Sequence, residues 1–242
     1  MMKKNCFLQL VCIVSIFAFF CTGCCNEPNP PFFQTYKESQ HKDIVAIAVI
    51  YDSSGSMSSS VANANGNREA KYTIANRALE SIYRKFDSFS KSLAEKNQEL
   101  YVEFIRFNGH GSIATVIPLK KFSLDEFIKT CSISDVNGGT PLGQAIMSAA
   151  KDLMESRAKK VHILLITDGR NSVGRSPEGA IKTIKDNGVF IPSYFITFDV
   201  ADGVFNDVKK MGGFVLSANN EKELNDRLNY VVEEKIMLEK EE

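Results

Sequence analysis

Three short segments of this 242-residue chain place oxygen-bearing side chains where they could hold a metal ion. The first segment, residues 52–56, reads Asp-x-Ser-x-Ser; the second, residues 138–141, reads Gly-Gly-Thr-Pro; the third, residues 167–169, reads Thr-Asp-Gly. Carboxylate and hydroxyl oxygens are the ligands that hard cations such as Mg²⁺, Mn²⁺ and Ca²⁺ prefer. The candidate metal ligands are Asp52, Ser54, Ser56, Thr140 and Asp168.

Each of these residues also has an ordinary structural explanation. Asp52 could cap the loop that follows a strand, and Ser54 and Ser56 are common turn residues. Thr140 precedes a proline and could cap a helix, whereas Asp168 stands before a glycine as in a plain turn. The three segments together, in this order and each at the boundary of a predicted element, favour a metal site over these separate explanations.

The elements that position the segments follow from the hydrophobic pattern. Residues 44–50 and 161–167 are nearly unbroken apolar runs, which are typical of strands buried on both faces of a parallel sheet. Each run leads directly into a candidate segment. Ligands of such sheets bind beyond the carboxyl ends of the strands, so we expect the candidate ligands to meet there.

The rest of the chain from residue 43 onward alternates further strands with helices. This alternation predicts a doubly wound α/β fold, in which a mostly parallel sheet with one antiparallel edge strand has helices on both faces. Residues 58–67, rich in Ser, Asn and Gly, predict a mobile loop. The predicted helices cover 72–93 and 221–236 and begin at a capping box at 123–126, at 140–141 and at 176–177; the predicted strands cover 101–107 and 112–119, paired as a hairpin, 189–198 and 214–216.

The three segments together resemble the metal-ion-dependent adhesion site of von Willebrand factor A domains, and the resemblance extends over about residues 43–236. It implies a Rossmann-like domain at residues 43–237. It also implies that Ser54, Ser56 and Thr140 bind the cation directly, with Asp52 and Asp168 binding directly or through water. The expected ion is Mg²⁺, with Mn²⁺ and Ca²⁺ as alternatives, and the expected partner is a protein that supplies an Asp or Glu carboxylate to the metal.

The N-terminus has the pattern of an export signal. Lys3 and Lys4 precede an apolar run over about residues 7–20, and small residues follow it. This segment resembles a bacterial lipoprotein signal, in which the cysteine after a small residue is lipidated, and Gly23-Cys24 fits that pattern. Cys21 stands where the family usually has leucine, and an uncleaved membrane anchor is the alternative.

The export pattern divides the chain into four parts. We expect a signal peptide at residues 1–23, a polar tether containing prolines at 24–42, the domain at 43–237 and a charged tail at 238–242. A lipid on Cys24 would anchor the protein to a membrane in the bacterial cell envelope. An uncleaved anchor would equally place the domain outside the cytoplasm.

Composition excludes several classes of function. The chain has 29 basic and 29 acidic residues and no basic block, so we expect no nucleic-acid binding. Five of its six cysteines lie in the first 25 residues, and only Cys131 lies beyond them. That distribution fits neither a disulfide framework nor a zinc site.

The favoured function is therefore metal-dependent protein binding without catalysis. The first segment is Asp-x-Ser and not the Asp-x-Asp of haloacid-dehalogenase-like enzymes; the chain also has no Gly-x-Ser-x-Gly motif and no histidine near the segments to act as a base. The alternative is an accessory subunit of a larger envelope complex or ATPase-driven machine. The chain has no P-loop, so any motor would be a separate protein.

Overall fold

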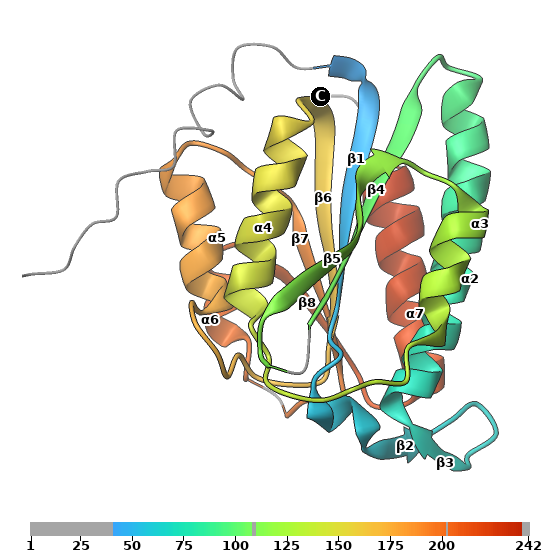
Figure 1. Cartoon of the computed structure of the whole chain (residues 1–242), viewed down its shortest axis with the longest axis vertical. Helices are drawn as coiled ribbons and strands as arrows, with labels where there is room; N and C mark the ends of the chain where they lie inside the picture. Colours follow the sequence, from blue (N-terminus) through green and yellow to red (C-terminus); the bar gives the residue numbers. More distant parts are fainter. Residues whose placement is uncertain (1–40, 108–109, 202, 239–242) are drawn as a thin grey trace, which may run out of the picture.

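The computed structural model describes residues 41–107, 110–201 and 203–238, and a six-stranded sheet lies at their centre (Figure 1). The strand order is β5-β4-β1-β6-β7-β8, with β5 antiparallel to β4 and the other neighbours parallel. This arrangement confirms the predicted fold class. The strands are β1 (His41–Tyr51), β4 (Glu99–Phe107), β5 (Ile113–Lys121), β6 (Ala158–Thr167), β7 (Ser193–Phe198) and β8 (Phe214–Ala218).

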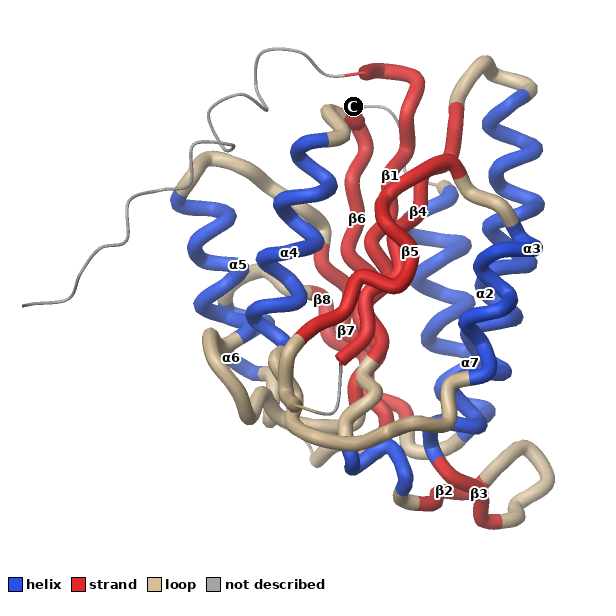
Figure 2. The backbone as a smooth tube through the Cα atoms, viewed as in Figure 1, coloured by secondary structure: helices blue, strands red, loops and turns tan. Residues whose placement is uncertain are grey.

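Helices cover both faces of the sheet (Figure 2). On one face lie α2 (Lys71–Ala94), the short α3 (Leu124–Phe127) with the 3₁₀ helix η3 (Ile128–Ser132), and α7 (Glu221–Tyr230), which continues as the π-helix η4 (Val231–Met237). On the other face lie α4 (Leu142–Glu155), α5 (Pro177–Asp186) and α6 (Asn206–Lys210). Each face of the sheet therefore has its own hydrophobic core.

The alternation of side chains along β1 explains why its sequence is apolar throughout. Ile47 and Val49 point into the core beneath α2 and α7, whereas Ala48 and Ile50 point into the core beneath α4 and α5. Every residue from Ala46 to Tyr51 is fully buried. A strand in the middle of a sheet that is covered on both faces favours apolar side chains throughout.

Some predicted boundaries were wrong, for local reasons. Ser123 precedes α3, but its side chain makes no capping hydrogen bond, and Glu126 pairs with Lys120 instead. The helix predicted from residues 140–141 begins at Leu142. The strand predicted from residue 189 begins after Pro192, which has no N–H to give to a sheet.

The segment predicted as a mobile loop, residues 58–67, contains a short strand. The segment follows the 3₁₀ helix η2 (Gly55–Ser58), includes β2 (Ser60–Ala62) and continues as a turn at residues 63–67 into β3 (Arg68–Ala70), which pairs with β2 as a small antiparallel hairpin. In Figure 1 this hairpin lies at the end of the molecule where β1 stops. Strands of three residues are too short to show a periodic pattern, which is why the sequence did not reveal them.

The predicted signal peptide, Cys24, most of the tether and residues 239–242 lie outside the described residues. The first strand begins at His41, two residues before the predicted start of the domain. Within the part of the chain that the structure describes, no helix is long and apolar enough to cross a membrane.

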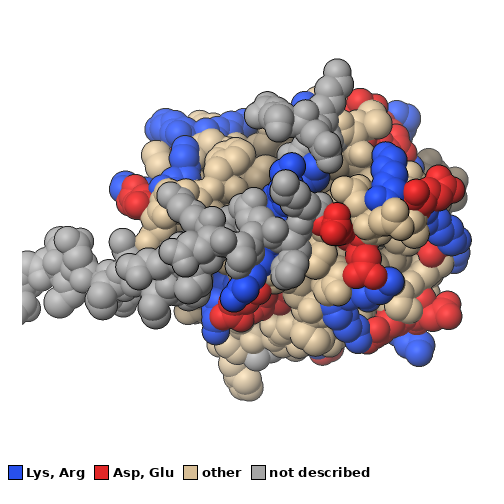
Figure 3. Space-filling view, turned by 90° about the horizontal axis from the view of Figure 1, so that it is seen from above, with Lys and Arg blue, Asp and Glu red and all other residues tan. Residues whose placement is uncertain are grey.

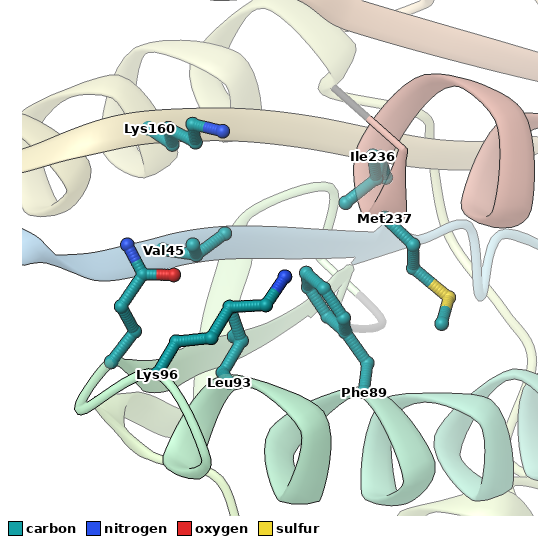
Figure 4. A pocket seen from close by; sticks show the side chains of 8 residues that line it. Val45, Phe89, Leu93, Lys96, Lys160, Ile236 and Met237 are labelled. Carbon is teal, nitrogen blue, oxygen red and sulfur yellow. The ribbon is translucent and has the colours of Figure 1, made fainter. Parts of the chain in front are cut away.

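A pocket of about 490 Å³ lies at the end of the sheet where β1 and β6 begin (Figure 4). Figure 3 views the molecule from this end, and basic and acidic side chains are interspersed on its visible part. The pocket is lined mainly by apolar side chains, and its polar lining residues are Lys96, Gln98 and Lys160. Among the described residues no carboxylate or hydroxyl side chain lines the pocket, so these residues do not form a site for a hard cation.

Candidate metal centre

The three candidate segments meet at the carboxyl edge of the sheet. The first and third follow β1 and β6, which are adjacent parallel strands, and the N–H of Asp52 donates to the carbonyl of Ile166 at 2.9 Å. The second segment is held to the first by backbone bonds, from the N–H of Gly55 to the carbonyl of Gly138 at 3.3 Å and from that of Asn137 to the carbonyl of Ser53 at 2.9 Å. Sheet topology therefore brings together residues more than 110 positions apart, as the bond between Ser56 and Asp168 shows.

Hydrogen bonds join four of the five predicted ligands into one cluster. The hydroxyl of Ser56 donates to Oδ1 of Asp168 at 2.6 Å, and the hydroxyl oxygens of Ser54 and Ser56 are 3.1 Å apart. Asp52 accepts at Oδ1 from the N–H of Ser54 at 2.8 Å and at Oδ2 from the hydroxyl of Thr167 at 2.5 Å. The side chains that the sequence predicted to be neighbours are thus in direct contact.

Thr140, the fifth predicted ligand, faces the same place. Its N–H donates to the hydroxyl of Ser172 at 2.8 Å, and its carbonyl accepts from the N–H of Ser172 at 3.0 Å. A Cβ atom at Gly169 would lie 3.6 Å from the hydroxyl oxygen of Ser56 and 3.8 Å from that of Thr140. The two hydroxyls therefore converge on the space beside Gly169, which a larger side chain would narrow.

The cluster is buried except on one side. Asp52, Ser54, Thr140 and Asp168 are buried, whereas Ser56 is exposed. Burial raises the pKa of Asp52, and the hydrogen bonds from Ser54 and Thr167 act in the opposite direction. A buried carboxylate that already has donors on both oxygens is held in one orientation, which is what a preorganised ion site requires.

The chemical composition of the cluster favours a hard cation bound largely by neutral oxygens. Among residues 41–107, 110–201 and 203–238, no three His, Cys, Asp or Glu side chains lie close enough together to hold a metal. The two carboxylates, Asp52 and Asp168, are accompanied by three hydroxyl side chains. This set suits Mg²⁺, which binds oxygen and retains some of its water, better than a soft metal.

Sequence reasoning missed two charged residues beside the cluster. Nζ of Lys71 lies 3.1 Å from Oδ2 of Asp168 and 2.9 Å from Oδ2 of Asp199. Asp199 directly follows β7, so the rule that ligands lie beyond the carboxyl ends of parallel strands could have found it. The position of Lys71 at the start of α2 carried no such signal.

Comparison with known proteins identifies the family of this fold. Residues 46–231 match the model of the von Willebrand factor type A domain family. The uncharacterized protein YwmC of Bacillus subtilis (strain 168) is 24% identical over 193 residues, which cover 76% of this chain and 81% of that protein.

Three solved structures share the fold at low sequence identity. The PilB minor pilin from Streptococcus sanguinis has a TM-score of 0.61 and 15% identity over 82% of this chain and 63% of the pilin. An aerotolerance-related membrane protein from Bacteroides fragilis has a TM-score of 0.51 and 19% identity over 76% of this chain and 98% of that protein. Proximal thread matrix protein 1 from the mussel byssus, with zinc in its MIDAS motif, has a TM-score of 0.56 and 20% identity over 80% of this chain and 48% of that protein.

These matches differ in how much of each protein they cover. The chain spans less than two thirds of the pilin and about half of the mussel protein, and at 15–20% identity all three structures show the fold. The family match covers most of the chain and includes all five residues of the cluster. This chain belongs to the von Willebrand factor type A domain family.

Proposed function

We propose that this protein binds a divalent cation through Asp52, Ser54, Ser56, Thr140 and Asp168, and through that cation binds a carboxylate of a protein partner. The observation that carries the proposal is the convergence of three hydroxyls and two carboxylates on one partly open space, with Ser56 at its exposed side. Mg²⁺ is the expected ion, with Mn²⁺ and Ca²⁺ as alternatives.

The charge of the cluster explains why a bound cation would attract a partner. Hydroxyl ligands carry no net charge, and the carboxylate of Asp168 already has Lys71 as a counter-ion. A divalent ion in such surroundings keeps part of its positive charge uncompensated. It would then favour one more anionic oxygen, and the Asp or Glu of a partner protein supplies one. The zinc in the MIDAS motif of the structurally similar mussel protein supports metal binding by this fold.

We propose no catalytic role for the domain. A nucleophilic carboxylate needs a free oxygen and a base or acid nearby. Both carboxyl oxygens of Asp52 accept hydrogen bonds, from Ser54 and Thr167. The arrangement therefore favours holding an ion over attacking a substrate.

Thermal unfolding of a chain that begins at residue 37, and so contains all the described elements, tests the metal site. We expect Mg²⁺ at about 100 times its dissociation constant to add about 2.7 kcal/mol, which raises the melting temperature by about 5–10 °C relative to EDTA. Asp52→Asn is expected to abolish the rise and to leave the fold intact. A wild-type protein that is folded but responds to no divalent ion would contradict the proposal.

Partner binding has its own test. Capture of an envelope protein by the immobilised domain is expected in Mg²⁺, to be lost in EDTA and with Asp52→Asn, and to be lost when one Asp or Glu of the captured protein is replaced by Ala. Capture that is equal in Mg²⁺ and EDTA would contradict a metal-bridged contact.

We further propose that the domain is held at a membrane of the bacterial envelope by a lipid on Cys24. The solved structures that it resembles include a bacterial membrane protein and a minor pilin, and the order of Lys3, Lys4, the apolar run and Gly23-Cys24 supports export. Metabolic labelling with palmitate is expected to mark the wild-type protein and not Cys24→Ala. Label that persists in the variant would show that Cys24 is not the lipidated residue.

A further inference from the structure

Lys71 is a buried cation beside the proposed metal site. It is the first residue of α2, directly after the hairpin of β2 and β3, and it is 5% exposed. Lysine is almost never buried to this degree unless it is paired. Its ammonium group lies between Asp168 and Asp199, at 3.1 Å and 2.9 Å.

The two oxygens of Asp168 are divided between two donors. Oδ1 accepts from the hydroxyl of Ser56, and Oδ2 pairs with Lys71. A divalent cation that approaches Asp168 therefore meets a carboxylate that is already neutralised. It also meets a like charge a few ångströms away, which opposes binding because little water is present to screen it.

Asp199 offers Lys71 a second partner. Its side chain is 49% exposed, in contrast with the fully buried side chain of Asp168. The ammonium group can thus keep a salt bridge toward solvent when Asp168 turns to a cation. This geometry allows the pairing of Asp168 to change without leaving a buried charge unpaired.

We propose that Lys71 is an internal counter-ion of the metal site: its ammonium group holds Asp168 when no divalent cation is bound and lowers the affinity of the site for that cation. The proposal rests on the metal site proposed above. Tight metal binding then requires additional negative charge, and the carboxylate of a partner provides it. Metal binding and partner binding are consequently coupled, each raising the affinity for the other.

The test measures the dissociation constants of Mg²⁺ and Mn²⁺ by calorimetry for the wild type and for Lys71→Met. Methionine keeps the length and helix propensity of lysine, and the backbone N–H of Lys71 keeps its bond to the carbonyl of Ser59. We expect the affinity of Lys71→Met to be at least tenfold higher. Lys71→Arg, which keeps the charge, is expected to remain within about threefold of the wild type.

Two further variants control the test. Lys85→Met lies on the same helix and removes an ion pair with Glu233, so it is expected to leave the metal affinity unchanged. If Lys71→Met fails to fold, Asp199→Asn serves instead, because its half-exposed side chain can be neutralised without burying a new group. It confines Lys71 to Asp168 and is expected to lower the metal affinity several-fold.

The outcomes separate the two proposals. Equal affinities for the wild type and Lys71→Met would overturn the role of Lys71 and leave the metal site standing, and so would an unchanged affinity of Asp199→Asn. Binding by the wild type, with at least tenfold tighter binding by Lys71→Met, would support both proposals. An absence of binding by every folded variant would overturn the metal site itself.

Discussion

Two of the places where the domain buries carboxyl groups are built in opposite ways. At the carboxyl edge of the sheet, Asp52 and Asp168 accept hydrogen bonds from backbone, hydroxyl and ammonium donors. In the middle of β4, Glu103 is fully buried, and among the residues that the structure describes neither of its carboxyl oxygens has a hydrogen-bond donor. Its ionisable neighbour is Asp152 on α4, another acid.

The difference shows how surroundings decide the charge of a buried acid. Donors and a nearby cation favour the ionised form, which is the form that can bind a metal. Burial without donors favours the protonated form. Burial, and then the carboxyl group of Asp152, raise the pKa of Glu103 to about 9. Carboxyl groups that look alike in the sequence thus lie in opposite surroundings: those at the sheet edge have hydrogen-bond donors, whereas Glu103 fills space as a neutral group.

The raised pKa of Glu103 makes the stability of the domain depend on pH. The folded protein holds the proton up to about pH 9, whereas the unfolded chain releases it near 4.5, the ordinary pKa of a glutamate side chain. The folded state therefore binds more protons between these values, and the contribution of Glu103 to the free energy of unfolding decreases as pH rises from about 4.5 to about 9.

Replacing Glu103 by glutamine has the largest expected effect. Glutamine resembles the protonated acid in shape and carries no charge, so the cost of retaining a proton disappears. We expect Glu103→Gln to raise the free energy of unfolding by about 3 kcal/mol at pH 7, by more at pH 8, and by little at pH 5. Urea unfolding at these three pH values measures the effect.

Glu99→Gln is the matched control on the same strand. Glu99 is exposed and pairs with Lys121, which lowers the pKa of Glu99. The control should leave stability nearly unchanged at all three pH values, because exposed ion pairs contribute little. Equal pH profiles for the wild type and Glu103→Gln would show that Glu103 is ionised in the folded protein, and the contrast between the two regions would disappear.

The contrast also explains what the sequence could and could not predict. Buried strands such as β1 are visible as unbroken apolar runs, and the order of the three segments predicted which oxygens meet. The burial of Glu103 could not be predicted, because an acid between Val102 and Phe104 is the pattern of a strand with one face in water. Only the position of α4, which local sequence does not specify, shows that this face is covered.

Lys71 and Asp199, which sequence reasoning missed beside the candidate metal site, have a similar explanation. Lys71 reaches the cluster because the hairpin of β2 and β3 delivers the start of α2 to it, and short hairpin strands leave no periodic trace. Asp199 adopts a positive φ of 55°, a local conformation that arises where β7 turns away from the sheet. Both positions depend on contacts between distant segments and not on their neighbours in the chain.

Replacing Thr167 by valine has an intermediate expected effect, because it removes one of the hydrogen-bond donors around the carboxylate of Asp52. Thr167 donates to Oδ2 of Asp52, and valine has the same shape without the hydroxyl. Asp52 would lose a donor that opposes the rise in its pKa. We expect Thr167→Val to lower the free energy of unfolding by about 2 kcal/mol without added metal, the usual range for leaving a buried charged group short of a partner.

Thr197→Val is the control for this change. Thr197 is the register partner of Thr167 on β7 and is equally buried, but its hydroxyl contacts neutral oxygens of Leu216 and Ser217. The expected loss is about 0.5–1.5 kcal/mol. If both variants lose the same amount, the hydroxyl of Thr167 contributes nothing specific to the carboxylate of Asp52.

Replacing Arg77 by methionine has the smallest expected effect, because the side chains of Arg77 and of its partner Glu69 are both partly exposed. Arg77 bonds both carboxyl oxygens of Glu69 on β3, at 2.6 Å and 2.8 Å, and Glu221 at the start of α7. Its hydrogen bonds lower the pKa of Glu69 to about 2, so this contribution to stability is present at neutral pH and lost as pH falls from about 4.5 to about 2.

The side chain of Arg77 is 45% exposed, so water and salt screen these bonds. We expect Arg77→Met to lower the free energy of unfolding by about 1 kcal/mol or less at low salt, and by still less in 1 M NaCl. Arg84→Met, which breaks a single exposed pair with Glu80 on α2, provides the baseline. A loss above about 2 kcal/mol that salt does not reduce would show that the ion pairs of Arg77 are shielded from solvent, as buried pairs are. Glu69 and Glu221 would then help to hold the hairpin, and with it Lys71, against the candidate metal site.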